Sequence, residues 1–383
     1  MDTTDIAILG SLILCFCIQV FYFLYFYIKP FSYNKKQKKD ISTIPEESLP
    51  GVSVIITAKN EYQNLSQFLP LVLEQDYPDF EVIVINDGST DESEDVLIEL
   101  SHKYKNLYKT YIPEEAKYLS RKKLALTVGI KAAKNDILLI TEANCEPLSK
   151  NWIKTMASNY SNGTDIVLGF SKFNRWGFCS RLAGYDNLLS ALRYFSCAIR
   201  KHPYMGVGSN LSYRKNLFFS IKGFAKRMHL QSGDDDLFVN DTATRTNTKV
   251  ELSEDSVTQT NIDSFKIWKE MKLCRTTTQK FYKGHEVAMW RFENITRFLY
   301  WGLTIFSCIY YWNTIYIPIA ATCLFLVKFV IHYFVINKSA KMFHVKRFYV
   351  SLVFYDLLQP LFNLYIAICR LFRGKLDYTW SLK

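Results

Sequence analysis

The sequence lacks the features of a metal-stabilised or disulfide-stabilised protein. Its nine cysteines include no CxxC pair and follow no regular spacing, so neither a zinc site nor a disulfide framework is supported. Histidines number only six, and His202, His229 and His285 do not have the spacing of metal ligands. Internal repeats and low-complexity segments are also missing. Unpaired cysteines of this kind are consistent with a reducing cytoplasm.

Acidic residues are fewer than basic ones, 36 against 47, which gives a formal net charge of +11. An excess of this size can indicate nucleic-acid binding. Here, however, the basic residues cluster beside long apolar segments, where anionic lipid headgroups attract each Lys or Arg by about 1 kcal/mol. We therefore expect membrane lipids as partners and no nucleic acid.

A first apolar segment, Ile6 to Ile28, is long enough to cross a bilayer, which takes about 20 helical residues. A cleaved signal peptide would begin with basic residues and end at a small-residue cleavage site. This chain begins Met1-Asp-Thr-Thr-Asp5, and its lysines follow the apolar run, from Lys29 to Lys39. We expect an uncleaved anchor in the cell membrane, with the N-terminus outside and the following residues in the cytoplasm.

Two further apolar segments lie near the C-terminus. Phe298 to Ile336 is too long for one span and is interrupted at Trp312-Asn313-Thr314, which predicts two helices joined by a tight outer turn. The last segment, Phe348 to Phe372, contains polar residues and is followed by a basic cluster. It either spans the membrane or, as we favour, lies in the interface, since a span would carry the basic cluster outside.

The central block, about residues 51 to 290, alternates strand patterns with amphipathic helical ones, which predicts a doubly wound α/β fold. Its three clearest strands are short β-branched runs of the kind buried in parallel sheets: Val52–Ile56, Val82–Ile85 and Ile137–Ile140.

Carboxylates follow each of these runs: Glu61, Asp87 and Glu142. Ligands of open parallel sheets bind at the carboxyl ends of the strands, so we expect these three side chains to line one crevice. They would suit a cation, a phosphate–metal complex or a sugar. Asp87-Gly88 on its own also fits an ordinary turn.

Four motifs together resemble those of membrane-bound family 2 glycosyltransferases, over the whole central block. They are Val52-Ser-Val-Ile-Ile-Thr-Ala-Lys-Asn-Glu61, Asn86-Asp-Gly-Ser-Thr-Asp91, Lys122-Lys123-Leu-Ala-Leu and Gly206-Val-Gly-Ser-Asn-Leu-Ser-Tyr-Arg214. The resemblance implies a GT-A fold, which is Rossmann-like with a mostly parallel sheet. It also implies inverting transfer of a sugar from a nucleotide diphosphate, most often UDP, to an acceptor.

The resemblance also implies roles for individual residues. Asp234 would be the general base, with Asp235 as the alternative because the register of the acidic run is uncertain. These acids equally suit the N-terminus of a following helix, Leu237 to Ala243. Acceptor-binding positions would be Gly208, Asn210 and Asp236. The nucleotide-sugar would be held by Ala58, Glu61, Asp87, Lys122 and Lys123.

The metal motif departs from the family pattern. Relatives carry Asp-Ala-Asp after the third strand, where this chain has Glu142-Ala143-Asn144. Mg²⁺ or Mn²⁺ accepts an amide oxygen, but the loss of a charge weakens the site. We expect Glu142 and Asn144 as ligands, with either reduced metal affinity or impaired catalysis.

A second departure concerns the helix before the C-terminal spans. The family's Gln-and-Arg series corresponds to Trp268–Arg275, in which Lys272 and Arg275 would clamp the diphosphate. Gln279-Lys280 offers another register, and basic residues here would also suit lipid headgroups.

The predicted protein is thus a multi-pass membrane enzyme that transfers a sugar to a lipid-linked or polysaccharide acceptor at the cytoplasmic face. The two altered motifs leave an alternative open, a catalytically degenerate scaffold subunit of a polysaccharide machine. The expected organisation is a transmembrane anchor, a basic linker, a GT-A domain, a transmembrane hairpin, and a basic loop with an interfacial or third C-terminal membrane helix: residues 1–29, 30–50, 51–293, 294–336 and 337–383.

Overall fold

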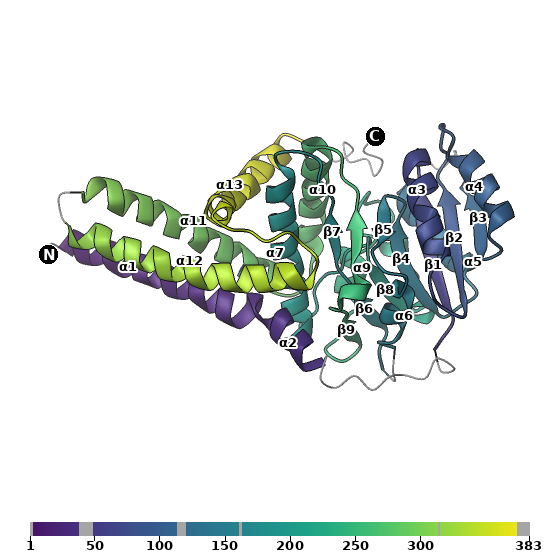
Figure 1. Cartoon of the computed structure of the whole chain (residues 1–383), viewed down its shortest axis with the longest axis horizontal. Helices are drawn as coiled ribbons and strands as arrows, with labels where there is room; N and C mark the ends of the chain where they lie inside the picture. Colours follow the sequence, from purple (N-terminus) through teal and green to yellow (C-terminus); the bar gives the residue numbers. More distant parts are fainter. Residues whose placement is uncertain (1–2, 38–48, 113–119, 161–162, 313–314, 374–383) are drawn as a thin grey trace.

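The computed structural model describes residues 3–37, 49–112, 120–160, 163–312 and 315–373. A globular α/β domain occupies one end of the molecule, and a bundle of long helices extends from it (Figure 1). The N-terminus lies at the far tip of this bundle, away from the globular domain.

A mixed, mostly parallel sheet forms the centre of the globular domain, with strand order β3-β2-β1-β4-β8-β6-β9. Its first four strands are parallel, β8 runs antiparallel to both neighbours, and β6 and β9 are parallel to each other. This confirms the predicted α/β fold class. The strands are β1 (Val52–Ala58), β2 (Phe80–Asn86), β3 (Leu107–Tyr111), β4 (Ile137–Glu142), β6 (Ile166–Leu168), β8 (Leu211–Arg214) and β9 (Thr248–Val250).

Both faces of the sheet are covered, which explains why its strands read as continuous apolar runs. Successive side chains of β1 alternate: Ile55 packs in the cluster that contains α5, and Val54 packs with α3 and α4. The other elements of the domain are α3 (Tyr62–Leu73), α4 (Ser93–Lys103), α5 (Arg121–Ala132), α6 (Trp152–Ala157), α8 (Lys215–Ser220), α9 (Asp236–Thr242), a small sheet β5-β10-β7 (Cys145–Pro147, Thr258–Thr260, Ser171–Phe173) and two 3₁₀ turns, η3 (Ala225–Arg227) and η4 (Glu254–Ser256).

Three helices form the bundle: α1 (Thr3–Phe21), α11 (Glu286–Tyr310) and α12 (Tyr316–Met342). Helix α1 continues through a π-helical segment, η1 (Tyr22–Tyr27), into α2 (Lys29–Gln37). The expected linker is therefore partly helical, and its residues 38–48 lie outside the described part. Helix α12, with 27 residues, is about 40 Å long, enough to cross the hydrocarbon core of a bilayer.

Helix α11 begins at Glu286, twelve residues before the apolar run that predicted it. The reason is that its first turns are amphipathic and bury one ion pair. Glu293 and Arg297 pair with each other and are both fully buried. Such a segment does not have the composition of a span, although it continues the same helix.

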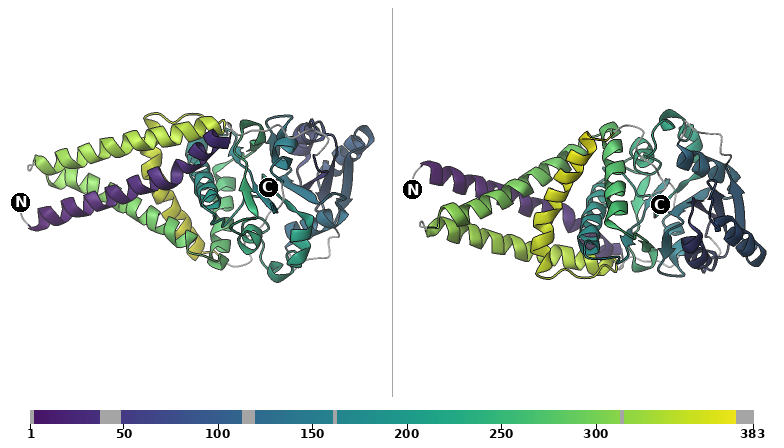
Figure 2. Two further views of the ribbon diagram at one scale, coloured as in Figure 1. Left: turned by 90° about the horizontal axis from the view of Figure 1, so that it is seen from below. Right: turned by 90° about the horizontal axis from the view of Figure 1, so that it is seen from above.

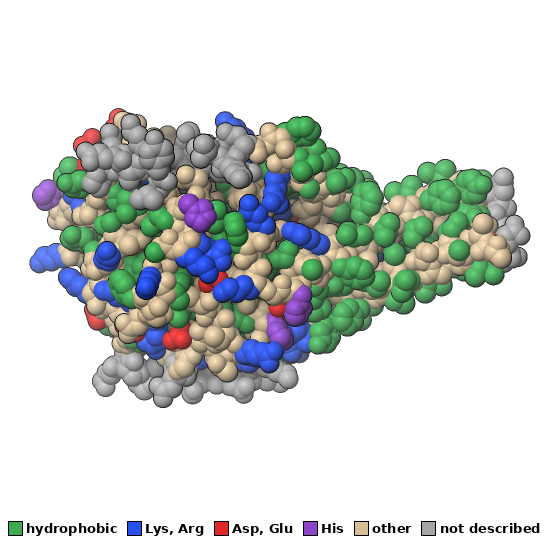
Figure 3. Space-filling view, turned by 180° about the vertical axis from the view of Figure 1, so that it is seen from behind, with side chains coloured by type: hydrophobic (Ala, Val, Ile, Leu, Met, Phe, Trp, Pro, Cys, Tyr) green, Lys and Arg blue, Asp and Glu red, His purple; other side chains and the backbone are tan. Residues whose placement is uncertain are grey.

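The outer surface of the bundle is apolar (Figure 3). Large hydrophobic side chains are exposed along all three helices, among them Leu14, Phe306 and Val330, while Lys and Arg side chains gather over the globular domain. Three helical segments, Thr3–Lys35, Tyr316–Met342 and Ser351–Leu371, are long and apolar enough to span a membrane. Exposed apolar surfaces of this extent are typical of sites that contact a membrane or another protein.

Charged groups lie inside the bundle instead. The carboxylate of Asp356 accepts hydrogen bonds from Lys328 Nζ at 2.6 Å and Trp301 Nε1 at 3.0 Å, and Arg297 Nη1 lies 3.6 Å from it. All four side chains are buried. Ionisable groups at this depth are tolerated when they pair with one another, and this cluster joins α11 and α12 to α13.

Three helices fill the junction between the bundle and the globular domain: α7 (Ser180–Ile199), α10 (Phe265–Thr278) and α13 (Ser351–Leu371). Helix α13 crosses the base of the bundle instead of running along it (Figure 2). It packs against α10, where the rings of Trp268 and Phe362 stack with centroids 4.0 Å apart. A short 3₁₀ turn, η5 (Gln279–Phe281), follows α10.

Candidate active site

The loops after β1 and β2 are tied together by hydrogen bonds from backbone N–H groups to side chains. Asn60 N donates to Ser89 Oγ at 2.9 Å, Glu61 N to Ser93 Oγ at 3.0 Å, and Thr90 N to the side-chain oxygen of Asn60 at 2.8 Å. Gly88 has a φ of +63°, a conformation that glycine adopts without strain. These contacts explain the polar and glycine residues of the first two motifs, which fix the edge of the sheet around Asp87.

Asp87 is fully buried at this edge, where its Oδ1 accepts a hydrogen bond from Arg121 Nε at 2.5 Å. The sequence analysis did not select Arg121. Its position directly before the Lys122-Lys123 pair, at the start of α5, is the one sequence feature that could have indicated a role at this site.

A cavity of about 180 Å³ lies beside this edge, and many of the predicted site residues line it. Lys122 Nζ lies between two carboxylates, 2.6 Å from Glu142 Oε1 and 3.1 Å from Asp234 Oδ2. Burial alone would lower the pKa of Lys122, but the two carboxylates outweigh it and hold that pKa well above its usual range. Of the predicted residues, the cavity brings together Glu61, Lys122, Glu142, Asn144, Asp234, Asp235, Asp236 and Arg275.

Asp235 caps the N-terminus of α9 and is held by two backbone N–H groups. Its Oδ1 accepts from Asp236 N at 2.6 Å, and its Oδ2 accepts from Gly208 N at 2.8 Å. Burial, together with the neighbouring carboxylates of Asp234 and Asp236, raises the pKa of Asp235 to about 7. Gly208, a predicted acceptor-binding position, therefore acts here through its backbone N–H group, which positions Asp235.

Asp236 lines the same cavity but is engaged with the end of α10. Its Oδ2 accepts a hydrogen bond from the Tyr282 hydroxyl at 2.6 Å and a short one from the Thr278 hydroxyl. Burial raises the pKa of Asp236, although these two hydrogen bonds oppose the shift. Thr278 and Tyr282 lie more than forty residues away in the chain, and nothing in the sequence marked them.

Lys123 lies beneath the cavity, not in it. Its side chain is fully buried and donates to the backbone carbonyls of Arg227, Leu230 and Ser232, each at 2.8 Å. Burial lowers the pKa of Lys123 to about 8. The side chain thus fixes the loop that leads into the acidic cluster, and it does not face a nucleotide-sugar as expected.

Asn210 also differs from expectation, because its side chain belongs to the protein interior. Its amide nitrogen donates to the carbonyls of Phe170 and Ser256, and its oxygen accepts from Trp152 Nε1 at 3.1 Å. With every polar atom of its amide engaged, Asn210 does not reach an acceptor. Ala58, at the end of β1, is likewise fully buried, so only its backbone is available.

Asn144 has a structural use that accounts for the altered metal motif. Its Nδ2 donates to the carbonyl of Asn261 at 3.0 Å, and Asn261 N donates back to the Asn144 carbonyl at 2.7 Å. An aspartate here would set a carboxylate oxygen against the Asn261 carbonyl. The described residues contain no cluster of three His, Cys, Asp or Glu side chains that could hold a metal ion alone. Glu142 and the Asn144 amide oxygen fit an ion that takes its remaining ligands from phosphate oxygens, as Mg²⁺ commonly does.

The two predicted clamp residues separate in the structure. Arg275 lines the cavity, whereas Lys272 points away from it and pairs with Asp186 of α7 at 2.8 Å. Gln279, from the other register, lines a second and larger space that Lys272 and Arg275 share. Lys280 is exposed and lines neither space. Arg275 is thus the one predicted clamp residue that borders both.

Comparison with known proteins finds a family whose sequence pattern matches part of the central block. The sequence pattern of glycosyl transferase family 2 matches residues 53–218. Glycosyltransferase AglE of Haloferax volcanii is 29% identical over 193 residues, which are 49% of this chain and 60% of that protein.

Two further proteins are similar to this chain, one in sequence and one in structure. A dolichyl N-acetyl-alpha-D-glucosaminyl phosphate 3-beta-D-2,3-diacetamido-2,3-dideoxy-beta-D-glucuronosyltransferase of Methanococcus voltae is 28% identical over 177 residues, 44% of this chain and 50% of that protein. The chain thus spans at most 60% of the length of these curated relatives. The mannosyltransferase PcManGT from Pyrobaculum calidifontis, solved with GDP-Man and Mn²⁺, shares the fold with a TM-score of 0.59, covering 95% of this chain and 98% of that chain at 14% identity.

Proposed function

Because residues 53–218 match the sequence pattern of glycosyl transferase family 2, we propose that this chain is an enzyme that transfers a sugar, with inversion, from a nucleotide diphosphate to a membrane-associated acceptor. One observation carries the proposal. A single cavity holds a candidate base, Asp234, beside the cation Lys122 and the metal-site residue Glu142. This is the combination that displacement of a diphosphate by a hydroxyl requires. A scaffold subunit would not need it.

The donor nucleotide would bind at the edge formed by the loops after β1 and β2. Asp87 is rigidly held there by Arg121, and Glu61 lies at the entrance to the cavity. Carboxylates in these positions suit the N–H groups of a base and the hydroxyls of a ribose. The diphosphate would then extend toward Lys122 and Arg275.

The reaction assigns a step to each group in the cavity. The acceptor hydroxyl attacks the anomeric carbon and gives its proton to the Asp234 carboxylate. The bond from that carbon to the donor phosphate breaks, and the nucleoside diphosphate leaves with the electron pair. Lys122 and Arg275 stabilise the negative charge that develops on it.

Glu142 and Asn144 would hold a divalent metal, Mg²⁺ or Mn²⁺, together with the diphosphate. Such an ion neutralises the leaving group as a Lewis acid. Lys122, which pairs with Glu142, lies beside this position and would contact the diphosphate.

The orientation in the membrane follows from charge. The positive-inside rule supports a cytoplasmic catalytic domain, with the N-terminus and the α11–α12 turn outside. Helix α13, lying across the base of the bundle, supports an interfacial position for residues 351–371. The relative from Methanococcus voltae, whose name includes a dolichyl-linked sugar phosphate, supports a lipid-linked acceptor.

The direct test measures nucleoside-diphosphate release by detergent-purified protein from a panel of UDP- and GDP-sugars, with and without Mn²⁺ or Mg²⁺. We expect metal-stimulated release from one donor. Asp87→Ala should weaken nucleotide binding by about tenfold or more, because a charge-assisted hydrogen bond contributes about 1.5–3 kcal/mol. Asp76→Ala, at an exposed position, is the matched control. Absence of nucleoside-diphosphate release from every donor, even with a lipid extract as acceptor, would favour the scaffold alternative.

The raised pKa of Asp235 gives a prediction for pH. The carboxyl is neutral below about pH 7 and ionises above it, as part of a coupled acidic cluster. Asp235 is the alternative base, and only its ionised form accepts a proton, so with Asp235 in that role kcat/KM rises as the pH increases through about 7 in the wild-type protein. Asp235→Asn cannot ionise, so its pH–rate profile should lack this rise. An identical rise in the variant would assign the titration to another group.

A further inference from the structure

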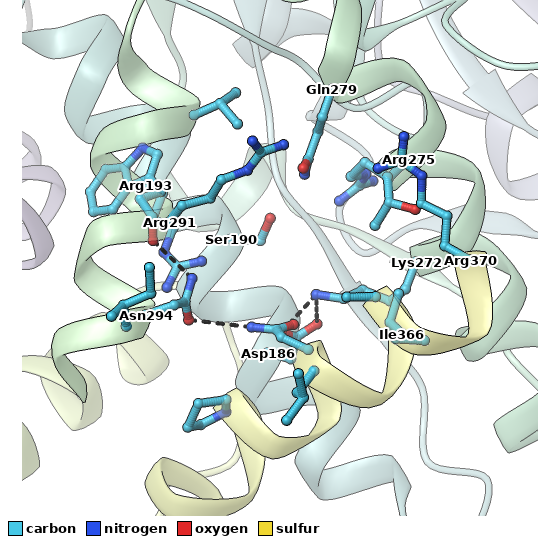
Figure 4. A pocket seen from close by; sticks show the side chains of 18 of the residues that line it. Asp186, Ser190, Arg193, Lys272, Arg275, Gln279, Arg291, Asn294, Ile366 and Arg370 are labelled. Atoms are coloured by element: carbon cyan, nitrogen blue, oxygen red, sulfur yellow. Dashed lines mark hydrogen bonds and ion pairs between the residues drawn. The ribbon is translucent and has the colours of Figure 1, made fainter. Parts of the chain in front are cut away.

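A large groove adjoins the catalytic cavity at the junction with the bundle. Its volume is about 1080 Å³, and it is bounded by α7, α10, α11 and α13 (Figure 4). Arg275 lines both the groove and the catalytic cavity. A molecule in the groove would therefore have one end beside the acidic cluster.

One side of the groove is strongly cationic. Five Lys and Arg side chains and a single carboxylate, that of Asp186, line it among the described residues. Lys272 is neutralised by Asp186, and Arg193 by Glu293 at 2.7 Å. Within the described part of the chain, no ion pair is formed by Arg275, Arg291 or Arg370. Figure 4 shows these arginines reaching the groove from three different helices.

The groove is also lined by apolar side chains of α11 and α13 that are partly exposed. Phe298 and Leu299 of α11 are about half exposed, at 46% and 49%, and Leu364 and Ile368 of α13 are similar, at 50% and 46%. The outer surface of the bundle, to which α11 belongs, is hydrophobic as well (Figure 3). A hydrocarbon chain could leave the groove here without entering water.

From this arrangement we infer that the groove is the binding site for the acceptor, and that the acceptor is a lipid whose hydroxyl-bearing head group is joined to its hydrocarbon chain through phosphate. The inference rests on the proposed function and names its substrate class. The phosphate pairs with Arg291 and Arg370, the chain lies between α11 and α13, and the head group passes Arg275 to bring its hydroxyl to Asp234. Arg291 and Arg370 form no ion pair within the described part of the chain and both line the groove, so they are available to pair with an anionic group of the ligand.

The test measures binding of hexadecyl phosphate to the full-length protein in a non-ionic detergent, with hexadecanol and inorganic phosphate as the two partial ligands. We expect saturable binding of hexadecyl phosphate at a single site per chain, and binding about tenfold or more weaker for either partial ligand. Arg291→Gln should weaken hexadecyl phosphate binding by about tenfold. Because Arg291 is exposed, its replacement leaves no buried cavity. Arg245→Gln, at an exposed position that lines neither space, is the matched control.

Several results would overturn the inference: equal binding of hexadecanol and hexadecyl phosphate, equal weakening in Arg245→Gln, or uptake that does not saturate. Nucleoside-diphosphate release, measured on the same preparation, separates this failure from that of the proposed function. Release without phosphate-lipid binding contradicts the groove assignment alone. Lipid binding without release from any donor contradicts the sugar transfer.

Discussion

Asp234→Asn is expected to lower the rate of sugar transfer by about 10²- to 10⁴-fold, the usual contribution of a general base. The variant keeps the size and shape of the side chain but cannot accept the acceptor proton. The effect should fall on kcat, because Asp234 contacts Lys122 and not the nucleotide edge around Asp87. Steady-state rates with a fixed donor, together with calorimetric measurement of nucleotide binding, separate an effect on kcat from an effect on nucleotide affinity.

The matched control is Asp241→Asn, on the same helix α9. Asp241 pairs with Arg227 outside the catalytic cavity, so its replacement perturbs α9 without touching the reacting groups, and the rate should stay close to wild type. A loss in Asp241→Asn equal to that in Asp234→Asn would indicate a general effect on folding. A larger loss in Asp235→Asn than in Asp234→Asn would move the role of base to Asp235.

The edge of the sheet was predictable because local sequence determines it. Runs such as Val52–Ile56 are mostly β-branched and apolar, which is the pattern of strands buried on both faces. The polar residues after them satisfy one another through short-range contacts between two adjacent loops, as Asn60 and Ser89 do. Convergence of Glu61 and Glu142 on one cavity follows once the strands are parallel.

The roles of Lys123 and Asn210 could not be predicted in this way. Both are polar residues in motifs that border the site, but their partners are backbone carbonyls brought in by distant segments, such as Ser232 and Ser256. A polar side chain in a functional motif satisfies a buried backbone group as readily as it binds a ligand. Only the tertiary arrangement distinguishes the two uses. The same holds for the hydrogen bonds that Thr278 and Tyr282 donate to Asp236.

The C-terminal helices illustrate another limit of the sequence. Polar residues in the segment Phe348 to Phe372 argued against a simple span, but their partners were not identifiable. Asp356 is matched by Lys328 on α12 and by Arg297 on α11, at separations that no local pattern encodes. The same cluster explains why the charged start of α11 is helical and buried.

This cluster gives the largest predicted effect on stability. Asp356→Asn should lower the free energy of unfolding by about 3–5 kcal/mol, because removing one partner of a buried ion pair leaves the remaining charges without compensation. The affected groups are Lys328, at 2.6 Å, and Arg297, at 3.6 Å. Unfolding in mixed micelles of increasing SDS content would measure the loss.

Two further variants test whether unpaired charge is the cause. Asp76→Asn, at an exposed position, should change the free energy of unfolding by less than about 0.5 kcal/mol. The double variant Asp356→Asn with Lys328→Met removes both charges of the closest pair and should recover part of the stability, since Arg297 retains Glu293. Without such recovery, the loss would come from packing at the α12–α13 contact, and the ion pairs would not be what holds α13 across the base of the bundle.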